Sequence, residues 1–198
     1  LEDSELEKAE EWLNNVLEAN TQLNIYHPES LYSFCHDLAS IAVKNNVLGG
    51  WAIERELLEY IYKNLQEGKS ILEFGSGKGT EALLKRYNVI SIEHDGHFLI
   101  QRAAHHQCIY APIESEWYEV SKVKKVIDES NYDLILVDGP PGELRSGILD
   151  HVEIFKKVSC RIIFDDMDRD LDLNTMIEFC RLLGFDYKII SGRTKMFA

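Results

Sequence analysis

A glycine-rich turn sets the fold of this chain, within the stretch Ile71-Leu72-Glu73-Phe74-Gly75-Ser76-Gly77-Lys78-Gly79-Thr80. The stretch begins apolar, as a buried strand does, and the turn leads into a helical pattern at 81–86. A strand that enters a helix through glycines presents unpaired backbone N–H groups at the positive end of the helix dipole. Glycines permit the unusual dihedral angles and let a ligand approach the backbone. We therefore predict a strand–turn–helix unit that binds a ligand.

Two classes of ligand use such a turn. Dinucleotide-binding domains prefer Gly-x-Gly-x-x-Gly, whereas this turn reads Gly75-x-Gly77-x-Gly79, with Thr80 in the place of the third glycine. The carboxylate of Glu73 would repel a pyrophosphate but would suit an ammonium group. The segment 73–80 resembles motif I of the class I S-adenosylmethionine methyltransferases. That resemblance implies that the amino-acid end of S-adenosylmethionine binds at Glu73, Phe74, Gly75, Ser76, Gly77 and Thr80.

The composition limits the partners. The 198 residues suffice for one α/β domain with its own core. A formal net charge of −13 argues against nucleic acid and against an anionic membrane surface, because both attract basic patches. It favours a small molecule or a glycan. No run is long enough to span a membrane, and the four cysteines form no Cys-x-x-Cys pair, so we expect a cytoplasmic protein.

The first 69 residues predict a helical cap. Apolar residues recur at helical spacing in three segments, which begin near Ser4, Ser30 and Ile53. We expect these helices to cover the cofactor-binding α/β core at 70–198, so that 1–198 forms a single domain. The loop 49–51 either only packs there or folds over the ligand. Because the chain begins with Leu1, we expect that it has been trimmed, and a lost N-terminal anchor stays open.

From Ser70 onward, strand patterns alternate with helical patterns, which predicts a parallel sheet with helices on both faces. The expected strands are 71–74, 89–93, 107–110, 134–137 and 161–164. A helix near 171–183 and two short strands near 186–190 and 194–197 follow, with a gap short enough for a hairpin. Class I methyltransferases end in an antiparallel hairpin, so the tail strengthens the resemblance. We predict an α/β, Rossmann-like doubly wound sheet of about seven strands with a C-terminal antiparallel hairpin.

An acidic residue ends the second expected strand. Glu93 lies 93 − 75 = 18 residues after the first glycine, and in a doubly wound fold such an acid can bind both ribose hydroxyls. His94 is expected to form the neighbouring wall of the cofactor pocket. For the loop after the third strand, the resemblance implies that Ala111 and Pro112 form an apolar wall against adenine.

The fourth expected strand ends in Asp138, followed by the rigid turn Gly-Pro-Pro-Gly at 139–142. A rigid loop places a catalytic group without a cost of ordering, and Arg145 beyond it is a candidate anchor for an anionic or hydroxyl-rich substrate. Amino-methylating DNA enzymes carry Asp-Pro-Pro and then an aromatic residue. The inserted Gly139, and Gly142 in the aromatic position, disfavour a nucleobase substrate.

The fifth expected strand ends in Asp165 and Asp166. Since this strand and the one before Asp138 should be neighbours, we expect the three carboxylates to meet beside the sulfonium end of the cofactor. The set resembles the metal-binding residues of catechol-type O-methyltransferases, with Asp166 in place of Asn. Either Mg²⁺ or another divalent cation binds Asp138, Asp165 and Asp166, or one of them stays protonated or pairs with Arg145 or Arg169.

These features predict an S-adenosylmethionine-dependent methyltransferase that acts on a hydroxyl of a small molecule or glycan. Asp138, Asp165 and Asp166 are its candidate catalytic residues. A nicotinamide-dependent oxidoreductase is the first alternative, disfavoured by Thr80 and the terminal hairpin. A non-catalytic cofactor-binding module is the second, disfavoured by the three aspartates. The methyl acceptor and the oligomeric state stay open.

Overall fold

The computed structural model describes residues 53, 55–191 and 196–197. The chain divides into two compact units, Leu1–Gly50 and Trp51–Ala198. All of the described residues belong to the second unit. The first two predicted cap helices and the loop 49–51 lie outside the described residues. The single-domain organisation of the chain stays a prediction.

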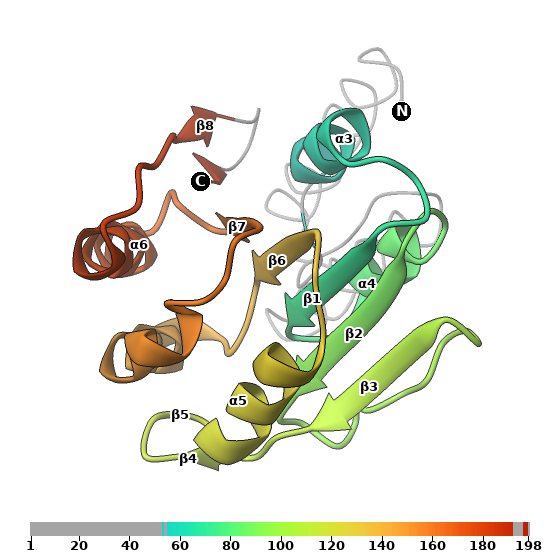
Figure 1. Cartoon of the computed structure of the whole chain (residues 1–198), viewed down its shortest axis with the longest axis horizontal. Helices are drawn as coiled ribbons and strands as arrows, with labels where there is room; N and C mark the ends of the chain where they lie inside the picture. Colours follow the sequence, from blue (N-terminus) through green and yellow to red (C-terminus); the bar gives the residue numbers. More distant parts are fainter. Residues whose placement is uncertain (1–52, 54, 192–195, 198) are drawn as a thin grey trace, which may run out of the picture. The chain divides into compact units, whose positions relative to one another are not determined.

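A five-stranded parallel sheet forms the centre of the fold (Figure 1). Its order is β3-β2-β1-β6-β7, with β1 at Ser70–Phe74, β2 at Asn88–Glu93, β3 at His106–Tyr110, β6 at Leu134–Val137 and β7 at Arg161–Phe164. The strand order changes direction between β1 and β6. In open α/β sheets, ligands bind at the carboxyl ends of the strands at such a switch point.

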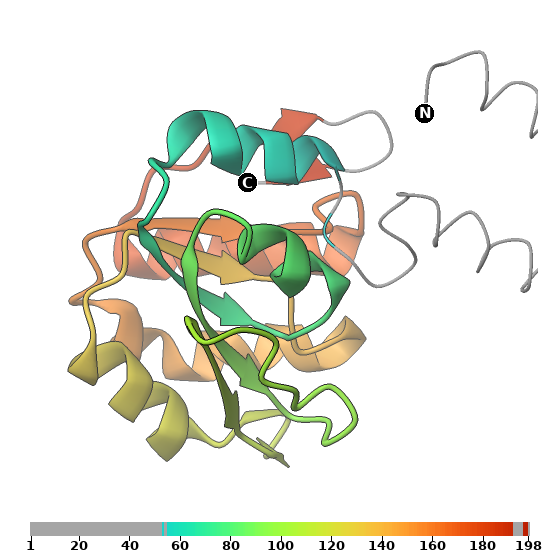
Figure 2. The same cartoon turned by 90° about the vertical axis from the view of Figure 1, so that its right-hand side faces the viewer.

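Helices cover both faces of the sheet, which is why the strands are apolar runs rather than alternating patterns (Figure 2). On one face, Leu72, Phe74 and Val137 pack in a core cluster with residues of α5 (Val120–Glu129), the 3₁₀ segment η1 (Gly142–Phe155) and α6 (Asp170–Leu183). On the other face, Ile71 and Leu136 pack with residues of α3 (Arg55–Asn64) and α4 (Lys78–Leu83).

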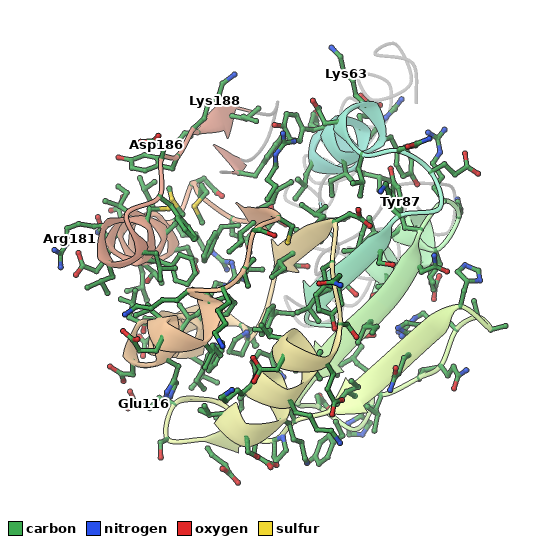
Figure 3. All side chains as sticks on the ribbon, viewed as in Figure 1. Lys63, Tyr87, Glu116, Arg181, Asp186 and Lys188 are labelled. Atoms are coloured by element: carbon green, nitrogen blue, oxygen red, sulfur yellow. The ribbon has the colours of Figure 1, made fainter. Side chains whose placement is uncertain are left out.

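Several charged side chains point outward from this layered core. Lys63, Arg181 and Lys188 are exposed and lie at the periphery of the molecule (Figure 3). Within the part of the chain that the structure describes, no helix has both the length and the apolar composition for crossing a bilayer.

The predicted α/β fold class is confirmed, and the five core strands lie within one residue of their expected ends. The C-terminal hairpin is also confirmed, as β8 (Ile190–Ser191) and β9 (Met196–Phe197). In the described residues, however, these two strands pair only with each other, so the main sheet has five strands rather than about seven.

Two connections differ from the expectation. The segment between β2 and β3 contains no helix in the structure. Turns replace it, in which the carboxylate of Asp95 accepts a hydrogen bond from the amide of His97 and Arg102 donates one to the carbonyl of Ile100. The segment after β3 forms a small hairpin of β4 (Ile113–Glu114) and β5 (Trp117–Tyr118), which the short apolar runs did not indicate.

Candidate functional site

The glycine turn joins the end of β1 to α4. Gly75 has a φ of +98°, which favours glycine because a side chain is strained there. Thr80 occupies the position of the third glycine of a dinucleotide-binding fingerprint. The hydrogen bonds of its hydroxyl explain why threonine rather than glycine suits this position. Its Oγ1 accepts a hydrogen bond from the Gly77 amide at 2.9 Å and donates one to Glu73 Oε2 at 2.7 Å. Thr80 therefore secures the first turn of the helix to the end of the strand.

The backbone that follows β1, at Gly75, and the backbone that follows β6, at Gly139, meet at the switch point. A Cβ atom at Gly139 would lie 3.1 Å from both the amide nitrogen and the Cα of Gly75, and 2.5 Å from the hydroxyl of Tyr118. A methyl group at Gly139 would therefore require the Tyr118 hydroxyl to move, whereas at Gly75 it is the positive φ that favours glycine. The turn after β1 and the turn after β6 thus lie in close contact.

Glu93 lies beside the turn, as predicted, and its side chain is almost buried. Its carboxylate accepts hydrogen bonds from the amide of Ser76 at 2.8 Å and from the amides of His94 and Asp95 at 2.7 Å each. These bonds hold the turn against the end of β2. Because a carboxylate has about four acceptor sites, Glu93 can accept a further bond from a ligand hydroxyl; its contact with ribose stays a prediction.

Glu73 is 2% exposed and points beneath the turn. Its Oε2 accepts hydrogen bonds from Thr80 Oγ1 and Ser91 Oγ, each at 2.7 Å. Burial raises the pKa of this carboxyl to about 7, although the two hydroxyl donors oppose the rise. The predicted contact of Glu73 with an ammonium group stays a prediction.

The other predicted cofactor contacts differ in what they can offer. The side chains of Phe74 and Ala111 are fully buried, so these residues can meet a ligand only through their backbone. Pro112 is partly exposed. The His94 ring packs edge-on against Tyr118, with the ring centroids 5.9 Å apart.

The three predicted aspartates lie together at the ends of β6 and β7. One carboxylate oxygen from each of Asp138, Asp165 and Asp166 lies within 4.8 Å of the other two. Asp166 has a φ of +64°, a region that non-glycine residues rarely adopt, and its amide donates to Asp165 Oδ1 at 2.8 Å. The group offers only oxygen ligands, the kind that Mg²⁺ and Ca²⁺ prefer.

Arg145 is not a substrate anchor, which corrects the expectation from sequence. Its side chain is 2% exposed, and its guanidinium faces the protein. Nη2 donates to the carbonyl of Asp138 at 2.5 Å, and Nη1 donates to the carbonyl of Asp165 at 3.0 Å. The guanidinium also lies 3.4 Å from a carboxylate oxygen of both Asp166 and Asp172. Arg145 therefore stabilises the acidic cluster from behind.

The cluster also shapes the protonation of its members. Burial, reinforced by the neighbouring Asp165, raises the pKa of Asp138 well above its usual range, against the opposing charge of Arg145. Burial likewise raises the pKa of Asp172. Arg169 forms ion pairs with Asp166 and Asp172. The pairing of an aspartate with Arg145 and Arg169, one of the two sequence-based alternatives, is thus present in the structure.

Sequence reasoning missed Tyr118. Its side chain is fully buried, and among the described residues its hydroxyl has no hydrogen-bond partner. Burial, with the nearby carboxylates of Glu93 and Asp138, raises its pKa well above 10, so the hydroxyl stays protonated. In the sequence, the aromatic pair Trp117-Tyr118 indicates only a position in the core. No neighbouring residue in the sequence indicates that the Tyr118 hydroxyl belongs to a site.

No family model matches the chain, and no curated protein matches it in sequence. Three solved structures show similarity in fold. Aeropyrum pernix fibrillarin with bound S-adenosyl-L-methionine is 9% identical with a TM-score of 0.48, over 67% of this chain and 66% of that one. A fibrillarin/Nop5p complex is 14% identical with a TM-score of 0.41, over 67% and 72%. The E. cuniculi Mtq2–Trm112 complex, which methylates the termination factor eRF1, is 15% identical with a TM-score of 0.42, over 72% and 88%.

These likenesses concern the fold alone. The sequence predicts the fold of the class I methyltransferases. The chain itself has the features of that fold class: the strand order β3-β2-β1-β6-β7, the glycine turn after β1 and the acid at the end of β2.

Proposed function

We propose that this chain is an S-adenosylmethionine-dependent methyltransferase that acts on a hydroxyl of a small molecule or glycan. The observation that carries the proposal is the close contact between the backbone of Gly75 and that of Gly139 at the switch point. Carboxylates lie on both sides of this contact: Glu73 and Glu93 beside the turn after β1, and Asp138 directly before Gly139. A close backbone approach suits a ligand lying on the switch point. The surrounding carboxylates favour a cation such as a sulfonium or an ammonium group over a pyrophosphate.

The residues present fit such a cofactor. The turn at 75–77 and Glu73 would hold its amino-acid end, and Glu93 would accept its ribose hydroxyls. When bound, the cofactor supplies an already activated methyl group, so the chain has two tasks. It must align the acceptor with that group, and it must remove the proton from the acceptor hydroxyl.

Asp138 is the best candidate for the proton-accepting group. Its raised pKa brings this carboxyl closer to the working pH of a general base. Its side chain is 23% exposed, against 12% for Asp166, so an acceptor reaches it more easily. Arg145 and Arg169 hold the neighbouring carboxylates in place. The alternative is that Asp138, Asp165 and Asp166 bind Mg²⁺ or another divalent cation, which would lower the pKa of the acceptor hydroxyl.

A binding experiment tests the cofactor first. We expect S-adenosylhomocysteine to raise the melting temperature of the full chain, and NAD to leave it unchanged. By titration calorimetry, Glu93→Ala should weaken S-adenosylhomocysteine about ten- to a hundredfold, or roughly 1.4–2.8 kcal/mol, because hydrogen bonds to a charged group are lost. The matched control is Glu81→Ala, an acid on α4 that is 62% exposed. Stabilisation by NAD alone would replace this proposal with the oxidoreductase.

A turnover experiment tests the chemistry. We expect release of S-adenosylhomocysteine when the protein is screened with S-adenosylmethionine and hydroxylated small molecules or glycans. Cofactor binding without turnover on any acceptor would favour the non-catalytic binding module. Repeating the assay after exhaustive EDTA treatment, with and without added Mg²⁺, separates the two versions of the aspartate site. Full activity in the chelated protein would reject the metal.

A further inference from the structure

A buried chain of hydrogen bonds runs beneath the glycine turn from the edge strand β3. His106 Nε2 lies 3.0 Å from Ser91 Oγ on β2, and that hydroxyl donates to Glu73 Oε2 on β1 at 2.7 Å. Thr80 Oγ1 donates to the same oxygen and accepts from the amide of Gly77. The four residues that supply these side chains are each at most 2% exposed. We call this chain the inner arm; it ends in the turn.

The donors and acceptors of the inner arm determine which nitrogen of His106 carries the proton. Ser91 has one hydroxyl proton and donates it to Glu73, so its oxygen must accept from His106 Nε2–H. The other ring nitrogen, Nδ1, is then an acceptor. The amide of Arg102 donates to it at 3.1 Å, as this arrangement requires. Burial lowers the pKa of His106, and the charges of Arg102 and His105 act in the same direction, so the imidazole is neutral.

A second connection, the outer arm, begins at that same Nδ1 atom. The side chain of Arg102 is 11% exposed. Its Nη1 donates to Ser76 Oγ in the turn at 2.8 Å and to the carbonyl of Ile100 at 3.0 Å. The two ring nitrogens of His106 therefore lead to adjacent residues of the turn, Gly77 through the inner arm and Ser76 through the outer arm.

We propose that His106 is a positioning residue that holds the glycine turn from both sides in its ligand-binding geometry. The imidazole lies on a different strand from the turn and reaches it only through Ser91 and Arg102. The hydrogen bonds described above support the role of His106 in holding the turn. Only the identity of the ligand rests on the proposed function. The proposal assigns a role to three residues, Ser91, Arg102 and His106, that no motif indicates.

The first test needs no ligand. Amide hydrogen exchange of the full chain should show the segment 75–80 exchanging about tenfold faster in His106→Ala than in the wild type, while β6 stays equally protected. His106→Gln places an N–H near the position of Nε2, and His106→Asn places an oxygen near that of Nδ1. Each should restore part of the protection, because each rebuilds one arm. The matched control is His105→Gln, an exposed neighbour whose ring nitrogen Nε2 lies 2.9 Å from the carbonyl of Leu84.

The second test measures the consequence for binding. His106→Ala should weaken S-adenosylhomocysteine about tenfold, with Gln and Asn within about threefold of the wild type. Unchanged exchange at 75–80 in His106→Ala would overturn the proposal, and so would equal losses in all three variants. If His106→Ala does not fold, Arg102→Met decides: unchanged exchange at the turn overturns the proposal. If the wild type binds no S-adenosylhomocysteine, the proposed function fails, and the exchange result still decides the role of His106.

Discussion

At the scale of single residues, the buried hydroxyl of Tyr118 is one of the side-chain groups of the site that have no hydrogen-bond partner among the described residues. It touches the point where Gly139 approaches Gly75, and among the described residues nothing hydrogen-bonds to it. An unpaired buried hydroxyl lowers stability, because its bonds to water are lost without replacement.

Removing that hydroxyl should therefore stabilise the free protein. We expect Tyr118→Phe to raise the free energy of unfolding by about 1 kcal/mol in urea denaturation. Tyr132→Phe is the control, since the Tyr132 hydroxyl donates to the carbonyl of Val126 at 3.0 Å. The control should lower the free energy of unfolding by about 1 kcal/mol. A loss of similar size in Tyr118→Phe would mean that its hydroxyl is paired in solution.

At the scale of elements, the site is made by loops that follow neighbouring strands, and two contacts join loops of different strands to each other. The glycine contact joins the turns after β1 and β6. Arg145, from η1, joins the ends of β6 and β7 through the carbonyls of Asp138 and Asp165. Each contact can be broken separately.

The glycine contact leaves no space for a methyl group. Gly139→Ala should lower the free energy of unfolding by about 1–3 kcal/mol through overpacking, whereas Gly96→Ala, where a Cβ meets nothing within 4 Å, should not. Because the nearest obstacle is the Tyr118 hydroxyl, adding Tyr118→Phe should recover part of the loss. Strict additivity of the two changes in a double-mutant cycle would contradict this packing.

The buried guanidinium is the second contact. Arg145→Met should lower the free energy of unfolding by about 3–5 kcal/mol, because it leaves the buried carboxylates of Asp166 and Asp172 with one cation fewer. Arg181→Met removes an exposed pair with Glu178 and should cost under about 1 kcal/mol. Similar effects of the two substitutions would show that Arg145 is hydrated rather than buried.

At the scale of the whole molecule, buried acids with raised pKa values make stability depend on pH. Glu73, Asp138 and Asp172 all have a higher pKa in the folded state than usual. Their contribution to the free energy of unfolding is fully present below the unfolded pKa of about 4, and it is lost as pH rises through the pKa values of the folded state. The exposed acids with lowered pKa values, such as Asp95 and Glu178, act only at more acidic pH.

We therefore expect Glu73 to reduce the stability of the free protein between pH 5 and pH 8. Its pKa rises from 4.5 to about 7, which corresponds to about 3 kcal/mol. Glu73→Gln should remove that part of the pH dependence when melting is followed across this range, and the exposed Glu81→Gln should not. A wild type and a Glu73→Gln variant with parallel pH profiles would contradict the raised pKa.

The strands, the turn and the acids at the strand ends could all be predicted from the order of the residues. Apolar runs, glycine spacing and the position of an acid after a strand are local properties, and parallel strands bring their carboxyl ends to one edge. That is why the order of residues alone places Glu93 next to the turn and the three aspartates next to one another, as they lie in the fold.

The surroundings of those side chains depend on the tertiary structure. Arg145 looks like a surface anchor in the sequence and becomes buried because the carbonyls and carboxylates that surround it come from separate parts of the chain. His106 reaches the turn through Ser91, 15 residues away, and the unpartnered hydroxyl of Tyr118 depends on Gly139. Within the described part of the tail, the two short strands pair with each other rather than with the main sheet. Local sequence patterns do not indicate contacts between residues that are far apart in the chain. Such contacts follow from the packing of the whole fold.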